Sequence, residues 1–328
     1  MLSIKNKDKM KFLVTGATGF VGRALITKML LNDDYHVSAS VRHVVNDMPS
    51  AVKQIKIDGI SSETDWRSAL QDVDCIIHAA ARVHVMSDRT TDPLKEFRQI
   101  NTEGTINLAK QAVESGVKRF IYLSSIKVNG EETLPGIQFT PEDIFVPTDF
   151  YALSKYEAEQ GLLSISKKTT MEVVIIRPPL VYGPGVKANF LTMMRWLHKG
   201  LPLPFGAIKN KRSFIALENL IDFIVTCIEH SAASNQVFLV ADGEDMSMSD
   251  LLTRLSLALG KQPRLLPINQ EFIQLLFKLF GKKDLATRIC SSLLIDMTKA
   301  KNLLGWNPPV SVDKGLKKTA KYFLEMNM

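Results

Sequence analysis

Tyr151 and Lys155 lie four residues apart in the run Tyr-Ala-Leu-Ser-Lys. If this run opens a helix, as Pro147, Thr148 and Asp149 before it indicate, both side chains share one face. A free tyrosine has a pKa of about 10 and exchanges protons poorly at neutral pH. A neighbouring lysine cation favours the phenolate and lowers that pKa, as general acid–base catalysis requires. The pair therefore predicts a catalytic proton donor with its activating cation.

A Tyr-x-x-x-Lys spacing alone is more typical of a solvated helix face, so the interpretation needs a second feature. Ser125 follows the apolar run Phe120–Ser124, which we predict to be a strand. The carboxyl end of a parallel strand would bring this hydroxyl to the same crevice as the helix. We expect Ser125 to hydrogen-bond the reacting oxygen. His78 also ends a predicted strand, but we assign it no proton role, because strand-end histidines usually serve structure.

Three glycines follow the first predicted strand, Lys11–Val14, and open an apolar helical pattern. Glycine permits a tight turn and close backbone approach, and the N-terminus of the helix stabilises a pyrophosphate. This context predicts dinucleotide binding rather than a simple turn. The residues expected to contact the cofactor here are Gly16, Thr18, Gly19, Phe20, Val21 and Gly22.

The segment after the second predicted strand reads Ser-Ala-Ser-Val-Arg-His and has no carboxylate before Asp47. Proteins that prefer NAD usually carry an acidic residue there for the ribose hydroxyls. Arg42 would instead pair with a 2′-phosphate, so we expect NADP, with NADPH preferred and NAD as the alternative. The competing interpretation is that Arg42 only covers the adenine ring.

Two further segments are expected to line the cofactor. The small residues Ala79, Ala80 and Ala81 end the fourth predicted strand and would let the dinucleotide pass close to the backbone. Asn101 would bond the main chain near the nicotinamide, or would alternatively cap the helix that it is predicted to open.

Short β-branched runs alternate with helical patterns from Lys11 to about Arg177, which predicts an α/β fold with a doubly wound parallel Rossmann sheet. A cluster of prolines after Arg177 marks a smaller, mixed C-terminal substrate domain. We expect residues 10–178 with about 213–241 to form the NAD(P)-binding domain, and 179–212 with 242–328 the substrate domain. The predicted strands are Lys11–Val14, His36–Ser40, Gln54–Ile57, Cys75–His78, Phe120–Ser124, Val173–Arg177 and Gln236–Val240, and the helices include Arg23–Leu31, Trp66–Leu70, Ile106–Ser115, Tyr151–Ser166 and Asn219–His230.

The composition narrows the class of protein. The chain has 328 residues, 45% of them hydrophobic, and three cysteines without metal-ligand spacing, so neither a disulfide scaffold nor a metal site is expected. Its net charge of +7 is spread along the chain, which argues against nucleic-acid binding. Residues 1–10 lack the apolar core of a secretory signal and no run is long enough to span a bilayer, so we expect a cytoplasmic protein.

One apolar stretch, Phe272–Phe280, is interrupted by Lys278 and is followed by Lys282 and Lys283. We interpret it as a helix packed within the second domain. Contact with an anionic membrane surface is the alternative.

With the glycine triplet, Ser125, Tyr151 and Lys155 in this order, the chain resembles the extended short-chain dehydrogenase/reductase superfamily over essentially its whole length. Two phrases, Arg-Pro-Pro-Leu-Val-Tyr-Gly-Pro-Gly at residues 177–185 and Leu-Gly-Trp-Asn-Pro at 304–308, are similar to its nucleotide-sugar epimerase/dehydratase branch. The resemblance implies a UDP-sugar substrate and allows a homodimer. It also implies contacts of Asp58 with the adenine, unless Asp58 is only a turn residue.

The same resemblance implies the substrate contacts. Asn189 with its apolar neighbour Phe190 would lie beside the diphosphate, and Arg212 would bind a phosphate, for which an arginine fork is suited. Further residues assigned on this basis are Arg82, Ser125 and Lys127 for the substrate and Tyr151, Lys155 and Pro178 for the cofactor.

Departures from the branch narrow the reaction. Dehydratases have Thr-Asp-Glu where this chain has Ser-Ile-Lys at 125–127, so dehydration is not expected. Several phrases look most like a bacterial subgroup that reduces UDP-4-keto-6-deoxy-N-acetylhexosamine, giving UDP-N-acetylquinovosamine or its C4 epimer for surface polysaccharide such as O-antigen. The first expectation is therefore an NADP(H)-dependent UDP-sugar 4-reductase. A UDP-hexose 4-epimerase with bound NAD is the runner-up, and a binding-only protein or a steroid or flavonoid reductase are weaker alternatives.

Overall fold

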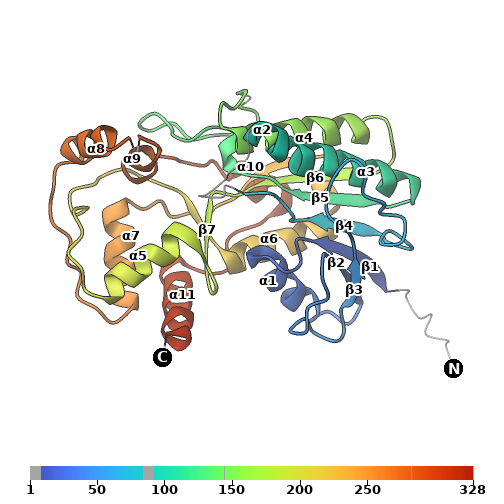
Figure 1. Ribbon diagram of the computed structural model, residues 1–328, viewed down its shortest axis with the longest axis horizontal. Helices are drawn as coiled ribbons and strands as arrows, with labels where there is room; N and C mark the ends of the chain where they lie inside the picture. Colours follow the sequence, from blue (N-terminus) through green and yellow to red (C-terminus); the bar gives the residue numbers. More distant parts are fainter. Residues whose placement is uncertain (1–8, 84–91, 144, 282, 328) are drawn as a thin grey trace. The chain divides into compact units, whose positions relative to one another are not determined.

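The structure is a computed structural model that describes residues 9–83, 92–143, 145–281 and 283–327. Seven strands form one sheet in the order β3-β2-β1-β4-β5-β6-β9, and neighbours from β3 to β6 run parallel (Figure 1). The predicted doubly wound α/β fold is confirmed. The strands are β1 Met10–Thr15, β2 Tyr35–Val41, β3 Lys53–Lys56, β4 Cys75–His78, β5 Arg119–Leu123, β6 Glu172–Arg177 and β9 Val237–Leu239.

The strand order reverses between β1 and β4. The chain builds outward from β1 to β3, then returns to place β4 on the other side of β1, where Thr15 is the register partner of His78. Connections on either side of such a switch point leave the sheet in opposite directions. They open a crevice at the carboxyl ends of the strands, where ligands of this fold class bind.

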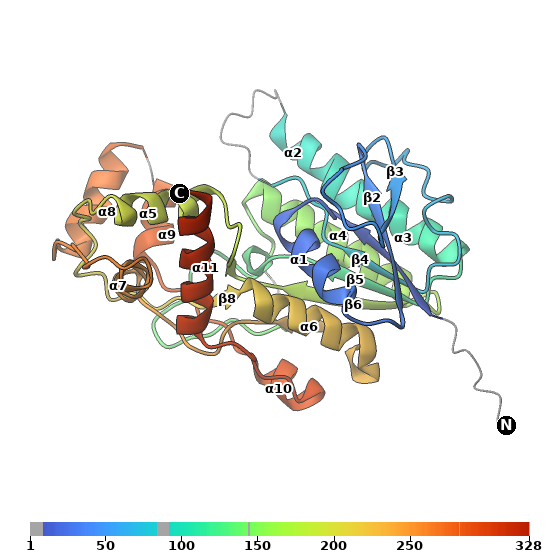
Figure 2. The same cartoon turned by 90° about the horizontal axis from the view of Figure 1, so that it is seen from below.

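Helices cover both faces of the sheet (Figures 1 and 2). Helices α3 Gly104–Glu114 and α4 Phe150–Ser166 lie on one face, and α1 Phe20–Met29 and α6 Leu217–Glu229 on the other. The α3 and α4 side packs aliphatic side chains such as Leu108 and Leu162 against Phe120 and Ile175 of the sheet. Burial on both faces explains why these strands read as continuous apolar runs.

The helical run before α3 begins earlier than the sequence pattern indicated. Helix α2, Pro93–Phe97, leads through a π-helical segment η1, Arg98–Glu103, directly into α3. Asp92 caps the run by accepting a hydrogen bond from Lys95 N at 3.1 Å, with proline at the first helical position. The prediction that Asn101 opens a helix is therefore wrong, because Asn101 lies inside η1.

The helix predicted at Trp66–Leu70 is also wrong. This segment makes hydrogen-bonded turns instead, with Ala69 N and Leu70 N both donating to Trp66 O. Trp66 is fully buried, and its backbone N donates to Gln111 Oε1 of α3 at 2.8 Å. The segment is thus held by long-range contacts that a local pattern does not contain.

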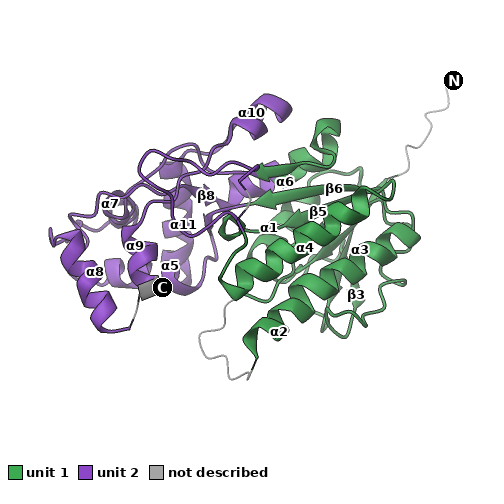
Figure 3. Cartoon of the chain, turned by 90° about the horizontal axis from the view of Figure 1, so that it is seen from above, with its two compact units in different colours: residues 1–128, 146–177, 224–238 green, residues 129–145, 178–223, 239–328 purple. Residues whose placement is uncertain are grey.

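The chain divides into two compact units (Figure 3). Unit 1 comprises residues 1–128, 146–177 and 224–238, and unit 2 comprises 129–145, 178–223 and 239–328. Unit 2 contains the parallel pair β7 Leu180–Tyr182 and β8 Phe214–Ala216, with a core that includes Tyr182, Phe190 and Leu316. Its helices are α5 Ala188–His198, α7 Met248–Ala258, α8 Gln270–Leu279, α9 Lys283–Cys290, α10 Thr298–Leu304 and α11 Val312–Met326, and two short 3-10 turns elsewhere are η2 Ile126–Val128 and η3 Ser231–Ala233.

Helix α8 differs from its sequence-based interpretation as a packed helix. Among the side chains of Gln270–Leu279, Ile273 is buried, whereas the leucines and Phe272 are exposed. Lys282, which the membrane alternative invoked, lies outside the described residues. Within the described part of the chain, no helix combines the length and hydropathy needed to cross a bilayer.

Candidate active site

The turn between β1 and α1 is shaped by its glycines. Gly16 has φ +68, and a Cβ there would lie 2.7 Å from the backbone of Ala79 and Ala80. A Cβ on Gly22 would lie 2.2 Å from Gly16 O, so the first turn of α1 approaches the loop too closely for any side chain. This packing brings the N-terminus of α1 against the carboxyl ends of β1 and β4. It forms the backbone cradle that a pyrophosphate requires.

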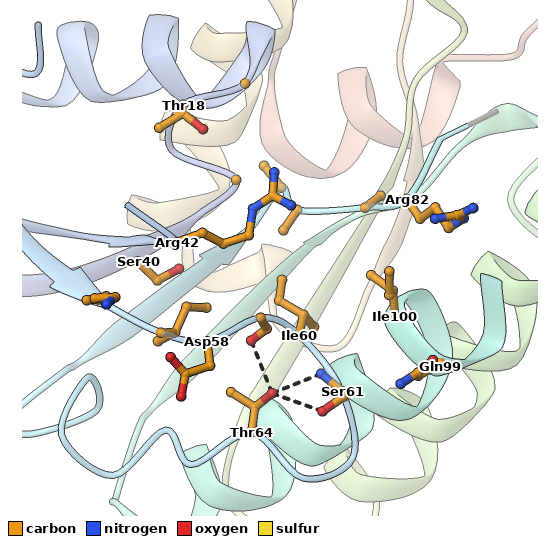
Figure 4. Close-up of a pocket in the computed structure, with 18 of the residues that line it drawn as sticks. Thr18, Ser40, Arg42, Asp58, Ile60, Ser61, Thr64, Arg82, Gln99 and Ile100 are labelled. Atoms are coloured by element: carbon orange, nitrogen blue, oxygen red, sulfur yellow. Dashed lines mark hydrogen bonds between the residues drawn. The ribbon is translucent and has the colours of Figure 1, made fainter. Parts of the chain in front are cut away.

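A cavity of about 1100 Å³ opens beside this cradle (Figure 4). Its walls come from the turn after β1, the ends of β2 and β3, the loop after β4 and the η1 segment, all in unit 1. The size and the small residues around the loop fit an extended dinucleotide. Nine residues assigned from sequence line it: Gly16, Thr18, Gly19, Arg42, Asp58, Ala79, Ala80, Ala81 and Arg82.

Sequence reasoning missed other lining residues. Ser40 lies near the end of β2, where its position two residues before Arg42 could have indicated it. Gln99 and Ile100 come from η1, whose π-helical turn left no periodic signal to find. Phe20, Val21 and Gly22 begin α1 beside the cavity and are not among its lining residues, so their predicted contacts with the cofactor stay a prediction.

The carboxylate of Asp47 is already engaged. Arg23 Nη1 donates to Asp47 Oδ2 at 2.7 Å and Arg23 Nη2 to Oδ1 at 3.2 Å, while Arg23 Nε donates to Thr18 O. This pair fixes the loop after β2 beside the glycine turn. Arg42, on the same loop, lines the cavity, while the carboxylate of Asp47 is paired with Arg23.

The proposed catalytic residues come together in unit 1. Asp149 Oδ1 accepts a hydrogen bond from Ala152 N at 2.8 Å and so caps α4, placing Tyr151 and Lys155 on successive turns. Burial raises the pKa of Tyr151 to about 12, with the Asp149 carboxylate adding to the rise and the Ser125 side chain opposing it. The Tyr151 phenol therefore keeps its proton at neutral pH.

Lys155 is 1% exposed, and its Nζ donates to Leu123 O at 2.7 Å and lies 4.1 Å from the centre of the Tyr122 ring. Burial lowers the pKa of Lys155 to about 7, against the opposing charge of Glu159. The expectation that this lysine lowers the pKa of Tyr151 is not met here. The reason is that desolvation dominates both groups, and the ammonium group is bound to a backbone carbonyl.

A buried ion pair supports the helix that carries these groups. Arg177 Nη2 lies 2.6 Å from Glu159 Oε2, and the side chains are 5% and 0% exposed. Arg177 Nε also donates to both Glu159 oxygens, so the contact is multidentate. It ties α4 to the carboxyl end of β6.

His78 is held as a neutral structural residue. Its Nδ1 lies 2.7 Å from Thr15 Oγ1 and its Nε2 2.9 Å from Thr105 Oγ1. Burial lowers the pKa of His78 to about 3, and the Lys155 charge adds to the effect. The ring stacks on Tyr122 at 5.7 Å, the same ring that lies under Lys155 Nζ. Through Thr15, His78 and Tyr122 on the neighbouring strands β1, β4 and β5, a chain of contacts runs from the glycine turn to Lys155.

Asn101 binds protein backbone in this structure. Its Oδ1 accepts from Arg82 N at 2.8 Å, and its Nδ2 donates to Arg82 O and to Ser154 Oγ at 3.0 Å each. Asn101 therefore fixes the loop after β4 to α4. Arg82 itself lies 3.6 Å from Glu96, and Lys127 Nζ lies 3.4 Å from Asp149, so both assigned substrate residues are in ion pairs.

The remaining assigned residues belong to unit 2. Asn189 is exposed at the start of α5, whereas Phe190 is 2% exposed and stacks on Tyr182, so its side chain is part of the core. Pro178 is buried at the start of the segment after β6. Arg212 is half-buried and donates to Ser291 O at 2.9 Å.

Sequence reasoning missed a second arginine near Arg212. Burial lowers the pKa of Arg212 to about 10, and the charge of Arg288 on α9 lowers it further. The charges of Glu131 and Glu132 oppose this decrease, so Arg212 has charges of both signs around it. The only signal of Arg288 in the sequence is a basic residue in a helix, which is too common to identify alone.

The parallel sheet, its switch point and the glycine cradle define a Rossmann dinucleotide-binding protein. The model of the NAD dependent epimerase/dehydratase family matches residues 12–241. The chain belongs to this family. Membership also agrees with the predicted nucleotide-sugar branch of the short-chain dehydrogenases.

Relatives and solved structures agree over nearly full length. A protein of Vibrio cholerae named UDP-glucose 4-epimerase is 49% identical over 322 residues, covering 98% of each chain. A 3-beta-hydroxysteroid dehydrogenase of Mycolicibacterium neoaurum is 26% identical and covers 97% of this chain and 93% of its own. The crystal structure of UDP-glucuronic acid 4-epimerase from Bacillus cereus in complex with NAD has a TM-score of 0.78 at 23% identity, covering 97% of this chain and 100% of its own. That structural likeness establishes the fold.

Proposed function

We propose that the protein is a UDP-sugar 4-epimerase that uses NAD. The main support is the placement of Tyr151 and Lys155 one helical turn apart on α4, with Ser125 acting on the pKa of Tyr151, in the unit that holds the glycine cradle. The 49% identical relative named UDP-glucose 4-epimerase supports epimerisation over the reductase that was first expected. The family description and the neighbour bound to NAD support NAD over the NADPH preference.

The residues divide the chemistry among them. Tyr151 exchanges a proton with the oxygen on C4, and Ser125 orients that oxygen through its own hydroxyl. Lys155 lies one turn further along α4, where its amine, bound to Leu123 O, would help to hold the cofactor beside Tyr151. NAD held in the glycine cradle would supply reversible hydride transfer at C4.

Binding of the two ligands is assigned to different residues. The backbone of Gly16, Thr18 and Gly19 would hold the pyrophosphate of NAD, because a Cβ at this turn would fill the space. Arg212, with Arg288 near it, and Asn189 would hold the diphosphate of the UDP-sugar. A steroid substrate needs no such cationic clamp, so the resemblance to a steroid dehydrogenase is not extended to activity.

A second candidate, an NADPH-dependent UDP-4-keto-sugar reductase, is favoured by one observation. Arg42 lines the cavity, and Asp47, the nearest following carboxylate, is paired with Arg23. A free guanidinium at this point would suit a 2′-phosphate. Arg42→Ala would then weaken NADPH binding while leaving NADH binding unchanged.

The deciding experiment offers both substrates to the purified protein. UDP-glucose with NAD should give UDP-galactose with no net change in absorbance of the reduced cofactor. A 4-keto-6-deoxy UDP-sugar with NADPH should leave that absorbance unchanged. Stoichiometric oxidation of NADPH by the keto sugar, without interconversion of UDP-hexoses, would replace the epimerase by the reductase.

A further inference from the structure

Helix α8 of unit 2 exposes a continuous apolar face. Phe272, Leu275, Leu276, Leu279 and Phe280 are 53%, 53%, 38%, 73% and 74% exposed. Their spacing of three and four residues puts them on one side of a helix. Large apolar side chains in a contiguous patch mark an interaction surface, unlike single exposed leucines.

The orientation of this face is fixed by the opposite side of the helix. Ile273 is 3% exposed within the core of unit 2, and Phe277 packs partly against the same core. Asn269 caps α8 by accepting a hydrogen bond from Glu271 N at 2.8 Å. Helices α8 and α9 also pack against each other (Figure 1). The apolar face is therefore presented outward by a helix that is anchored, not by a loose segment.

The stretch of sequence that contains α8 carries mainly positive charge. Lys278 is exposed on the flank of the helix, and in the described part of the chain it makes no ion pair. The sequence from 261 to 288 contains two acidic residues, Glu271 and Asp284, and six basic ones: Lys261, Arg264, Lys278, Lys282, Lys283 and Arg288. A helix with phenylalanine and leucine on one face and lysine beside it suits an anionic lipid surface.

A second copy of the chain fits this surface less well. Ten residues of helix extend about 15 Å at 1.5 Å per residue, and a helix is about 10 Å wide. Such a face is far smaller than the roughly 800 Å² that each partner contributes to a stable protein interface. Lipid contact has no such minimum area, because side chains can insert singly into the interface of a bilayer.

We propose that the outward face of α8 docks the protein on an anionic phospholipid bilayer. Phe272, Leu275, Leu279 and Phe280 enter the boundary of head groups and acyl chains, while Lys278 remains at the level of the phosphates. This docking goes beyond the proposed reaction and does not depend on it. It adds a peripheral attachment that keeps the protein at a membrane surface.

The test is co-sedimentation of the full chain with vesicles of equimolar phosphatidylglycerol and phosphatidylcholine, compared with phosphatidylcholine alone. The test variant combines Leu275→Glu with Leu279→Glu. A matched control combines Leu31→Glu with Leu257→Glu, which are 76% and 57% exposed outside α8. We expect the wild type and the control to bind the anionic vesicles. The affinity of the test variant for these vesicles should be at least about tenfold lower.

Circular dichroism of both variants establishes that they remain folded. Binding should decline as salt is raised, because part of the attraction is electrostatic. Absence of binding to anionic vesicles at low salt would overturn the proposal, as would equal binding by wild type and test variant. A dimer in sedimentation velocity that Leu275→Glu with Leu279→Glu dissociates, without vesicle binding, would assign the face to a second copy instead.

Discussion

The candidate site combines Tyr151, whose pKa is raised, with Lys155, whose pKa is lowered, and burial is the largest cause of both shifts. In an exposed pair the lysine charge would govern, but here the loss of hydration outweighs it. Ser125 is the group that moves the Tyr151 pKa toward neutrality. In the proposed reaction, Ser125 therefore acts on the proton of Tyr151 more directly than Lys155 does.

Replacing Tyr151 by phenylalanine removes the hydroxyl and little else. We expect turnover of a UDP-sugar to decrease by about 10²- to 10⁴-fold, the usual contribution of a general acid or base, with NAD binding retained. Steady-state kinetics and NAD titration measure the two effects. Tyr156→Phe, on the same helix, serves as the control and should keep normal turnover. Normal turnover in Tyr151→Phe would remove the proposed proton donor.

The buried lysine has a stability consequence that depends on pH. The folded pKa of Lys155 is about 7, below its ordinary value of 10.5. Between these values the unfolded chain binds more protons than the folded one, so the lysine's contribution to stability rises with pH in this window. Lys155→Met should therefore be more stable than the wild type at pH 7, with a difference that shrinks toward pH 9.5.

Thermal unfolding of both proteins across this pH range measures the difference. Lys110→Met, at an exposed position of α3, is the comparison for general effects of pH. If the difference in stability between Lys155→Met and wild type is the same at all pH values, the pKa of Lys155 is not lowered in the folded protein.

The glycine cradle depends on close packing of helix α1 against the turn after strand β1. Gly22→Ala would place a Cβ 2.2 Å from Gly16 O and push the helix away. We expect NAD affinity to decrease at least about tenfold, together with a loss of about 1–3 kcal/mol in unfolding free energy from overpacking. Gly116→Ala meets no atom within 4 Å and tests the effect of alanine with positive φ alone. Equal NAD affinity in both variants would contradict the proposed cradle.

Arg119 at the start of β5 joins the sheet to the end of α6. Its Nη1 donates to Cys227 O and Ile228 O at 2.8 Å each, and its Nε to Glu172 Oε2 at 2.7 Å. Arg119→Met leaves these acceptors unpaired and should cost about 2–3 kcal/mol of unfolding free energy, measured by urea denaturation. Lys118→Met removes an exposed pair with Asp74 and should cost less than about 1 kcal/mol. A smaller loss for Arg119→Met than for Lys118→Met would refute this view.

Binding of NAD should change the stability of the whole folded protein. A ligand that binds only the folded state raises the unfolding free energy by about 2.7 kcal/mol at a concentration one hundred times its Kd. NAD should therefore raise the Tm of the wild type and of Tyr151→Phe alike, and raise that of Gly22→Ala much less at the same concentration. Differential scanning fluorimetry measures this. An equal rise in Gly22→Ala would place the nucleotide elsewhere.

The sequence alone determined four local features: the alternation of strands and helices, the glycine turn, the position of Ser125, and the helix that carries Tyr151 and Lys155. These features are local, because strand and helix periods and glycine turns depend on residues that are neighbours in the chain. The family resemblance followed from the same short phrases. The same phrases predict a reductase, with the epimerase as the alternative.

Only the tertiary structure decided which groups are buried and with what partners. It engaged Asp47 with Arg23, placed Asn101 inside a π-helical turn, turned Trp66 into an anchor for a loop, and left the apolar face of α8 exposed. Each outcome depends on residues distant in sequence that compete for the same partner or the same surface. Burial and desolvation are properties of that assembly, so neither the pKa of Lys155 nor the outward face of α8 could be deduced from local pattern.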